Sequence, residues 1–281
     1  MNRRNFITAS LALALLGCAP SAGAAAPPFQ PKRFSVVVRG SGPDVILVPG
    51  LTASRDIWNG TVAAVPGYRY HLIQVNGFAG TGPGANASGP VVAALADEIA
   101  AYVKARGLTA PAMVGHSMGG TLTMMVAARH PGLIGRAMVV DMLPQPAGLL
   151  GSSASGVRGL AETLRGLTAS PGGRELVSSL IGMFGNPQAE ATRSDPDLVA
   201  RVTHELALTD LTPELPRIKV PLTVVYAVPD AESRAVVENG YREAYAAKRD
   251  AKLVRIDDSG HMVMYDRPAA FQAALRAFLA R

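Results

Sequence analysis

The sequence predicts an α/β fold with a mostly parallel central β-sheet flanked by helices. Two observations support this prediction. Short runs of Val, Leu and Ile alternate with amphipathic segments along most of the chain, and the short runs are apolar at consecutive positions, as in strands buried on both faces. The composition agrees, because 281 residues with 48% hydrophobic and 17% charged side chains can bury a sizeable core. Disordered, coiled-coil and collagen-like chains are excluded.

The expected strands and helices follow one another along the chain. Strands are predicted at 34–39, 44–48, 71–75, 112–115, 136–141, 222–227 and 252–256, and helices at 90–106, 119–130, 232–247 and 268–281. Pro49-Gly50 ends the second strand in a sharp loop. Pro90 is suited to a first helical turn, Gly107 to a helix stop, and Pro131 ends the next helix.

Residues 145–219 interrupt this alternation. They contain amphipathic pieces such as 157–165 and 197–206, separated by Gly, Pro and Ser. Ligands of open α/β sheets bind beyond the carboxyl ends of the strands, so we predict a helical lid over that edge rather than an insertion without a role. The lid divides the core into a first part, 27–144, and a second part, 220–281.

Residues 1–26 have the composition of an export signal. Arg3 and Arg4 precede an apolar run and then small residues, and the arginine pair resembles a twin-arginine signal. Ala22-Gly23-Ala24 suits an ordinary signal peptidase. Leu15-Leu16-Gly17-Cys18 instead resembles a bacterial lipobox, in which Cys18 becomes a lipid anchor. We therefore expect a periplasmic or secreted protein, or a membrane-anchored lipoprotein.

Charge and cysteine content limit the partners. Cys18 is the only cysteine, so an intramolecular disulfide is excluded. The net charge of +6 falls to +4 without Arg3 and Arg4. No basic run with interleaved aromatic residues is present, so we expect no nucleic-acid partner. No segment after the signal is long and apolar enough to predict a transmembrane span.

Ser117 is the candidate nucleophile. Gly115-His116-Ser117-Met118-Gly119 matches the pattern G-x-S-x-G and lies between a predicted strand and a predicted helix. In that context the serine occupies a strained turn, and a Cβ at either glycine would strike the neighbouring strand or helix. A glycine-rich turn that merely opens a helix is the alternative.

A serine hydroxyl needs a general base. His261 follows the last predicted strand, so it should lie at the same carboxyl edge as Ser117. Asp230 follows the strand at 222–227 and is our choice for the carboxylate that orients the histidine. Asp141, at the end of an earlier strand, is the rival. We favour Asp230 on the chain order Ser–Asp–His and on its position beyond the penultimate strand.

These residues, together with Val48-Pro49-Gly50-Leu51, resemble the α/β-hydrolase family, and the resemblance extends from Phe34 to Arg281. It implies the α/β-hydrolase fold and a mechanism without metal or cofactor, in which an acyl-enzyme forms on Ser117. It also implies an oxyanion hole made by the backbone N–H groups of Leu51 and Met118. Pro49 departs from the many relatives that have histidine there.

The expected function is an exported serine hydrolase that cleaves a carboxylic ester. One alternative is an amidase or depolymerase of an acidic substrate such as a poly-aspartate chain. The basic excess and Arg55, a candidate substrate contact just past the oxyanion loop, motivate it. The other is a non-catalytic binding protein on the same fold. The substrate is thus expected to be a small or oligomeric ester or amide.

Overall fold

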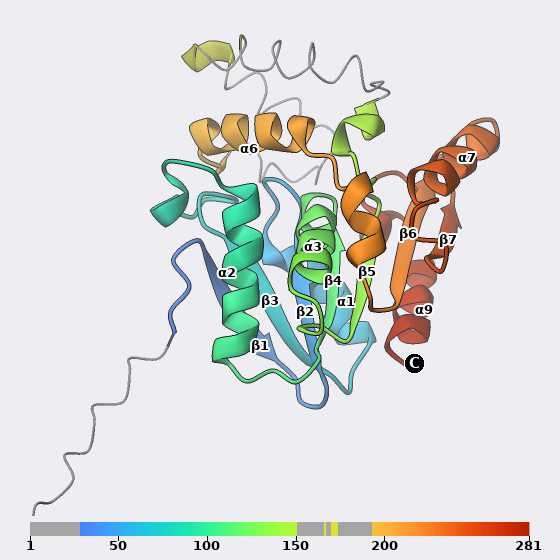
Figure 1. Ribbon diagram of the computed structural model, residues 1–281, viewed down its shortest axis with the longest axis horizontal. Coiled ribbons are helices and arrows are strands. Elements are labelled where there is room, and N and C mark those ends of the chain that lie inside the picture. Colours follow the sequence, from blue (N-terminus) through green and yellow to red (C-terminus); the bar gives the residue numbers. More distant parts are fainter. Residues whose placement is uncertain (1–28, 151–165, 167–169, 174–192, 281) are drawn as a thin grey trace, which may run out of the picture.

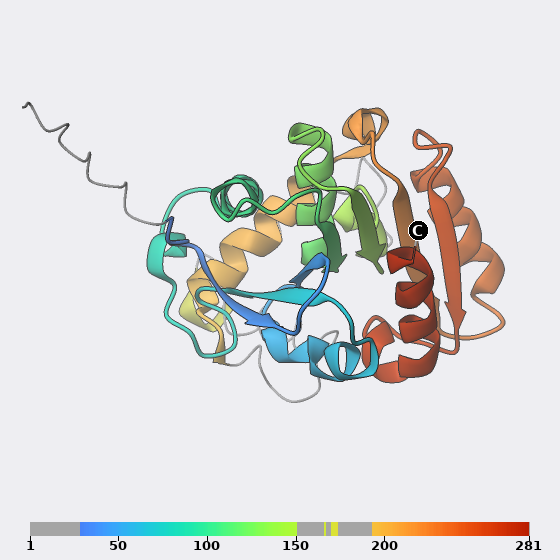
Figure 2. The same ribbon diagram turned by 90° about the horizontal axis from the view of Figure 1, so that it is seen from below.

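The computed structural model describes residues 29–150, 166, 170–173 and 193–280. At its centre is a seven-stranded sheet in the order β1-β3-β2-β4-β5-β6-β7 (Figure 1). The strands are β1 (Phe34–Arg39), β2 (Asp44–Val48), β3 (Arg69–Val75), β4 (Ala112–His116), β5 (Arg136–Val140), β6 (Leu222–Val228) and β7 (Lys252–Asp257). Only β1 pairs antiparallel in this sheet, with β3. The predicted mostly parallel sheet is confirmed, and Figure 2 shows its blue amino-terminal strands and orange carboxyl-terminal strands at opposite ends.

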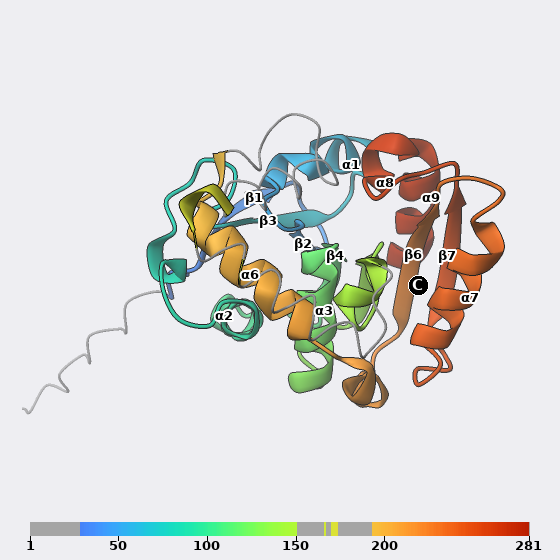
Figure 3. The same ribbon diagram turned by 90° about the horizontal axis from the view of Figure 1, so that it is seen from above.

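Helices cover both faces of the sheet. In Figure 3, α2 and α3 lie on one side, and α1, α8 and α9 lie on the other. Their bounds, with those of α7, are α1 (Asn59–Ala64), α2 (Val92–Ala105), α3 (Met118–Arg129), α7 (Arg234–Ala244), α8 (Val263–Asp266) and α9 (Pro268–Leu279). Short 3₁₀ turns are η1 (Arg55–Trp58), η2 (Gly84–Asn86), η3 (Pro146–Leu150) and η5 (Thr212–Arg217). No helix in the described ranges is long and apolar enough to cross a membrane.

The strands are apolar at consecutive positions because the sheet separates two cores. In β2, Ile46 and Val48 pack into the core under α2 and α3. Val45 and Leu47 pack into the opposite core, with Trp58 from η1 and with α9. Side chains alternate between the faces of a strand, so a strand buried on both faces needs an apolar residue at every position. This arrangement is the physical origin of the runs in the sequence.

The chain returns to the core through α6 (Pro196–Leu208), which confirms the helix expected at 197–206. Asp195 caps this helix by accepting a hydrogen bond from Leu198 N at 2.8 Å. The segment 193–195 is held by the loops after β2 and β3. Asp195 N donates to Gly77 O at 2.7 Å, and Ser194 Oγ donates to Thr52 O at 3.4 Å. The helix predicted at 157–165 lies outside the described residues, so the lid stays a prediction.

Candidate active site

Ser117 lies in the turn between β4 and α3. Its backbone angles are φ 54° and ψ −124°, in the left-handed half of conformational space that non-glycine residues rarely adopt. The turn is fixed on one side by a hydrogen bond from Ser117 N to Val140 O of β5, at 2.9 Å. The predicted strand–turn–helix context of the serine is therefore present, with the serine half-buried.

Glycines permit this turn because the surrounding backbone leaves no room for a side chain. A Cβ added at Gly115 would lie 1.9 Å from Gly119 O, and one added at Gly119 would lie 2.3 Å from Val48 O. One added at Gly50 would come within 3.1 Å of the Ser117 Cβ. The loop after β2 and the start of α3 therefore meet closely around the serine.

His261 pairs with Asp141. The His261 Nδ1 lies 2.7 Å from the Asp141 Oδ2, and the two side chains are 26% and 10% exposed. Asp141 directly follows β5, where His116 is in register with Val140, so Asp141 lies beside the Ser117 turn. Within the described part of the chain, no hydrogen bond joins the Ser117 hydroxyl to His261. Such contacts often tighten only when a substrate is bound.

The choice of Asp230 as the partner of His261 is wrong. Asp230 is exposed, and its Oδ1 accepts a hydrogen bond from Ser233 N at 2.7 Å. This hydrogen bond from the Ser233 backbone lowers the pKa of Asp230. Both aspartates lie between Ser117 and His261 in the chain, so chain order could not separate them. Two residues beyond the end of β6, Asp230 begins the turn into α7 instead of facing the histidine.

The Asp141 carboxylate is held by further donors. Its Oδ1 accepts hydrogen bonds from Ala227 N and from the Tyr241 hydroxyl, both at 2.9 Å. Tyr241 is not among the site residues that the sequence predicts. The spacing of Tyr241 and Tyr245 on a predicted helix indicates only that both belong to a buried helical face. It does not indicate that Tyr241 donates a hydrogen bond to the Asp141 carboxylate.

His116 supports His261 from the other side. Its Nε2 donates to the His261 carbonyl oxygen at 2.9 Å, and the two imidazole rings lie 4.7 Å apart. Burial, reinforced by the neighbouring His261, lowers the pKa of His116 to about 3. His116 is therefore neutral at physiological pH, and it bonds the backbone of His261 rather than the Ser117 hydroxyl.

The two backbone amides predicted to form an oxyanion hole belong to Leu51 and Met118, which lie on either side of the Ser117 turn. Met118 is the first residue of α3, so its N–H has no acceptor within the helix. Leu51 follows Gly50, which packs against Ser117. Neither N–H donates a hydrogen bond to another of the described residues. The positive end of the α3 dipole adds a favourable potential for an anion at this point.

Arg55, the predicted substrate contact, is held by the strands beside it. Its guanidinium donates to Leu72 O at 3.3 Å and to the Ser35 hydroxyl, while its backbone N–H donates to Gln74 Oε1 at 2.9 Å. These partners belong to β3 and β1. The Arg55 side chain therefore braces two strands near the edge of the sheet, and its contact with substrate stays a prediction.

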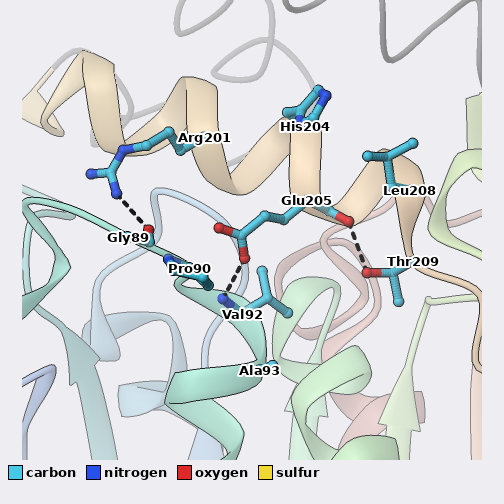
Figure 4. Close-up of a pocket in the computed structure, with 9 residues that line it drawn as sticks. All are labelled: Gly89, Pro90, Val92, Ala93, Arg201, His204, Glu205, Leu208 and Thr209. Atoms are coloured by element: carbon cyan, nitrogen blue, oxygen red, sulfur yellow. Dashed lines mark hydrogen bonds between the residues drawn. The ribbon is translucent and has the colours of Figure 1, made fainter.

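A pocket of about 510 Å³ lies between α2 and α6, lined by residues other than those around Ser117 (Figure 4). Glu205 reaches from α6 to the start of α2 and accepts hydrogen bonds from Val91 N and Val92 N, at 2.9 and 2.7 Å. Arg201 donates to Gly89 O at 3.0 Å. These contacts join α6 to α2, and Glu205 also supplies the cap that α2 lacks from its own residues.

A model of the alpha/beta hydrolase family matches residues 45–274. N-formylmaleamate deformylase from Pseudomonas putida is 27% identical over 262 residues, which cover 85% of this chain and 90% of the relative. The enol-lactonase of Burkholderia xenovorans has a TM-score of 0.68 at 20% identity, with 88% of this chain and 96% of that chain covered. An esterase from Thermogutta terrifontis has the same TM-score and identity, with 88% and 93% covered. The family match runs from β2 to α9, so the chain belongs to the alpha/beta hydrolase family and is a hydrolase.

Proposed function

We propose that this protein is an exported serine hydrolase that cleaves a carboxylic ester through an acyl-enzyme on Ser117. One observation carries the proposal: the strained Ser117 turn lies at the same sheet edge as a His261–Asp141 pair joined at 2.7 Å. A strained turn presents the hydroxyl, and an imidazole oriented by a buried carboxylate is a competent base. In this proposal Asp141 orients His261, in place of Asp230, which was expected to do so from the sequence.

The proposed reaction uses only residues of this chain. As the Ser117 Oγ bonds to the acyl carbon, its proton moves to the His261 Nε2, and the carbonyl becomes an oxyanion. The Leu51 and Met118 N–H groups stabilise that oxyanion, each typically contributing about 3 kcal/mol. The bond to the alkoxy group then breaks, and His261 gives its proton to the departing alcohol. Water attacks the acyl-enzyme in the same way, releasing the acid and restoring Ser117.

An amide of a small acyl group is the second candidate substrate. The 27% identity to a relative named as a deformylase, over nearly all of both chains, supports it. The poly-aspartate version loses one of its arguments, because the Arg55 guanidinium is occupied by β1 and β3. A binding protein without activity would have no need of the strain at Ser117 or of the buried His–Asp pair.

Ser117→Ala tests the proposal. We expect turnover to disappear and the melting temperature to stay close to that of the parent, because the hydroxyl serves reactivity rather than packing. Purified protein would be assayed on p-nitrophenyl esters of increasing chain length, on lactones, on small amides and on polyanions. A fluorophosphonate probe should label Ser117 alone. Substantial turnover by Ser117→Ala would refute the acyl-enzyme, and turnover of amides but not esters would select the second candidate.

A further inference from the structure

We propose that Tyr241 is a positioning residue of this enzyme, whose hydroxyl holds the Asp141 carboxylate in the orientation that pairs with His261. This inference rests on the proposed serine-hydrolase function. It adds a third side chain to the histidine–carboxylate pair, contributed by α7 from a distant part of the chain.

The two oxygens of the Asp141 carboxylate have different hydrogen-bond partners. Oδ1 accepts from the Tyr241 hydroxyl and from Ala227 N, both at 2.9 Å, while Oδ2 faces His261 Nδ1 at 2.7 Å. Rotation of the carboxylate about Cβ–Cγ would break the two Oδ1 bonds together. Tyr241 therefore helps to keep Oδ2 on the imidazole, and it is the one side chain among the described residues that bonds Oδ1.

Tyr241 is itself firmly held. Its ring stacks on Tyr226 with centroids 4.6 Å apart and lies parallel to Tyr245 at 6.4 Å. The side chain is buried, with 4% of the residue exposed. Burial, and next the charge of Asp141, raise the pKa of the Tyr241 hydroxyl well above its usual value. The phenol thus stays protonated at any working pH, and a protonated phenol facing a carboxylate must be the donor.

Removing this donor has a chemical consequence at His261. A hydroxyl bonded to Oδ1 draws part of the carboxylate charge toward itself. Without it, more of that charge faces the imidazole, which favours the imidazolium. Because only the neutral imidazole can accept the Ser117 proton, the acid limb of the pH–rate profile should move to higher pH. A freer carboxylate should also orient the imidazole less well and lower kcat.

The other titratable groups around His261 and Asp141 do not account for a shift of the acid limb. His116, packed against His261, is kept neutral by burial. Burial also raises the pKa of Tyr245 well above its usual value, so it stays uncharged. Tyr226 lies behind Tyr241, and its pKa is raised first by burial and then by Glu238, with Arg255 and Arg242 opposing. The acid limb therefore reports on the His261–Asp141 pair.

The experiment compares Tyr241→Phe with Tyr245→Phe. Tyr245 is a matched control, because its buried hydroxyl donates to a backbone carbonyl, Met142 O at 2.7 Å, instead of to the carboxylate. For Tyr241→Phe we expect kcat to fall about tenfold and the midpoint of the acid limb of kcat/KM to rise by about 0.5–1 pH unit. For Tyr245→Phe the midpoint should stay within about 0.2 unit. Thermal melts establish that both variants are folded.

Two further measurements separate the possible failures. The NMR titration of the His261 imidazole, recorded without substrate, should show the same upward shift in Tyr241→Phe. In an Asp141→Asn background, adding Tyr241→Phe should change kcat by less than about twofold, because the group through which Tyr241 acts is already gone. Both proteins in this comparison lack the Asp141 carboxylate. The comparison therefore still tests the proposal if Tyr241→Phe alone folds poorly.

The outcomes are distinct. Ser117-dependent turnover with an unchanged acid limb and an unchanged His261 titration in Tyr241→Phe would overturn the inference and leave the proposed function standing. An equal loss of kcat in the parent and Asp141→Asn backgrounds would overturn it too. Turnover independent of Ser117 would defeat the proposed function, while the NMR titration would still report whether Tyr241 acts on the pair.

Discussion

At Asp141 the chain tolerates an unfavourable backbone conformation. The residue has φ 50°, a left-handed value that costs a non-glycine residue on the order of 1 kcal/mol or more. The turn is secured by Asp141 N, which donates to Val225 O at 2.7 Å. Four hydrogen bonds at one residue, with Val225, Ala227, Tyr241 and His261, thus offset the strain. Strain retained in this way is common where a side chain must be aimed.

This residue carries a direct prediction. Asp141→Asn should lower kcat by about 10⁴-fold with the fold retained, because an amide favours the wrong imidazole tautomer and cannot stabilise the imidazolium. Asp230→Asn is the matched control and should leave kcat within about twofold, since it weakens only an exposed turn contact in which the amide oxygen can still accept from Ser233 N. Both would be measured as kcat on the best ester of the panel. The reverse ranking of the two variants would return the orienting role to Asp230.

At the scale of elements, the close approach of α3 to the end of β2 decides whether the serine turn forms. Gly119 belongs to the first turn of α3, and a Cβ there would lie 2.3 Å from Val48 O and 2.8 Å from Pro49 O. Both neighbours are backbone atoms, which cannot move aside as the tip of a flexible side chain can. The helix would have to shift away from the strand.

Gly119→Ala should therefore destabilise the protein by about 3 kcal/mol, as overpacking against backbone does. Gly60 is the matched control: it is exposed in α1, and nothing lies within 4 Å of a Cβ added there. Gly60→Ala should be neutral or stabilising by up to about 1 kcal/mol. Urea unfolding measures both changes. Equal effects of the two substitutions would contradict the packing explanation.

At the scale of the whole molecule, the prediction concerns whether the protein is exported from the cytoplasm. Residues 1–26 lie outside the described residues, and the expectation of export rests on Arg3-Arg4 and the apolar run behind them. We expect native material to be processed within this segment. Intact-mass spectrometry would find a start after Ala24 for a soluble exported enzyme, or a diacylglyceryl mass on Cys18 for a tethered one. Unprocessed Met1 in a cytosolic fraction would contradict both.

The sequence by itself determined most of the elements and the position of the serine. Strands buried on both faces require consecutive apolar residues, so the predicted strand at 44–48 coincides with β2, and the others shift by at most two residues at an end. The Ser117 turn was equally visible, because its requirements are local: a strand, two glycines and a helix start. His261 was located by the rule that the carboxyl ends of parallel strands share one edge.

Only the tertiary structure decided which side chains meet at that edge. His261 and Asp141 are 120 positions apart, and Asp141 and Tyr241 are 100 apart. Two aspartates follow neighbouring strands, and both fit the chain order. The choice between them depends on a turn at φ 50° and on the direction of one side chain. Arg55 likewise lies beside the oxyanion loop in sequence, yet its guanidinium points to β1 and β3. The periodicity of apolar residues predicts burial, because each buried position within a strand or helix requires an apolar side chain. The partner of a polar side chain depends instead on how distant strands and helices pack together.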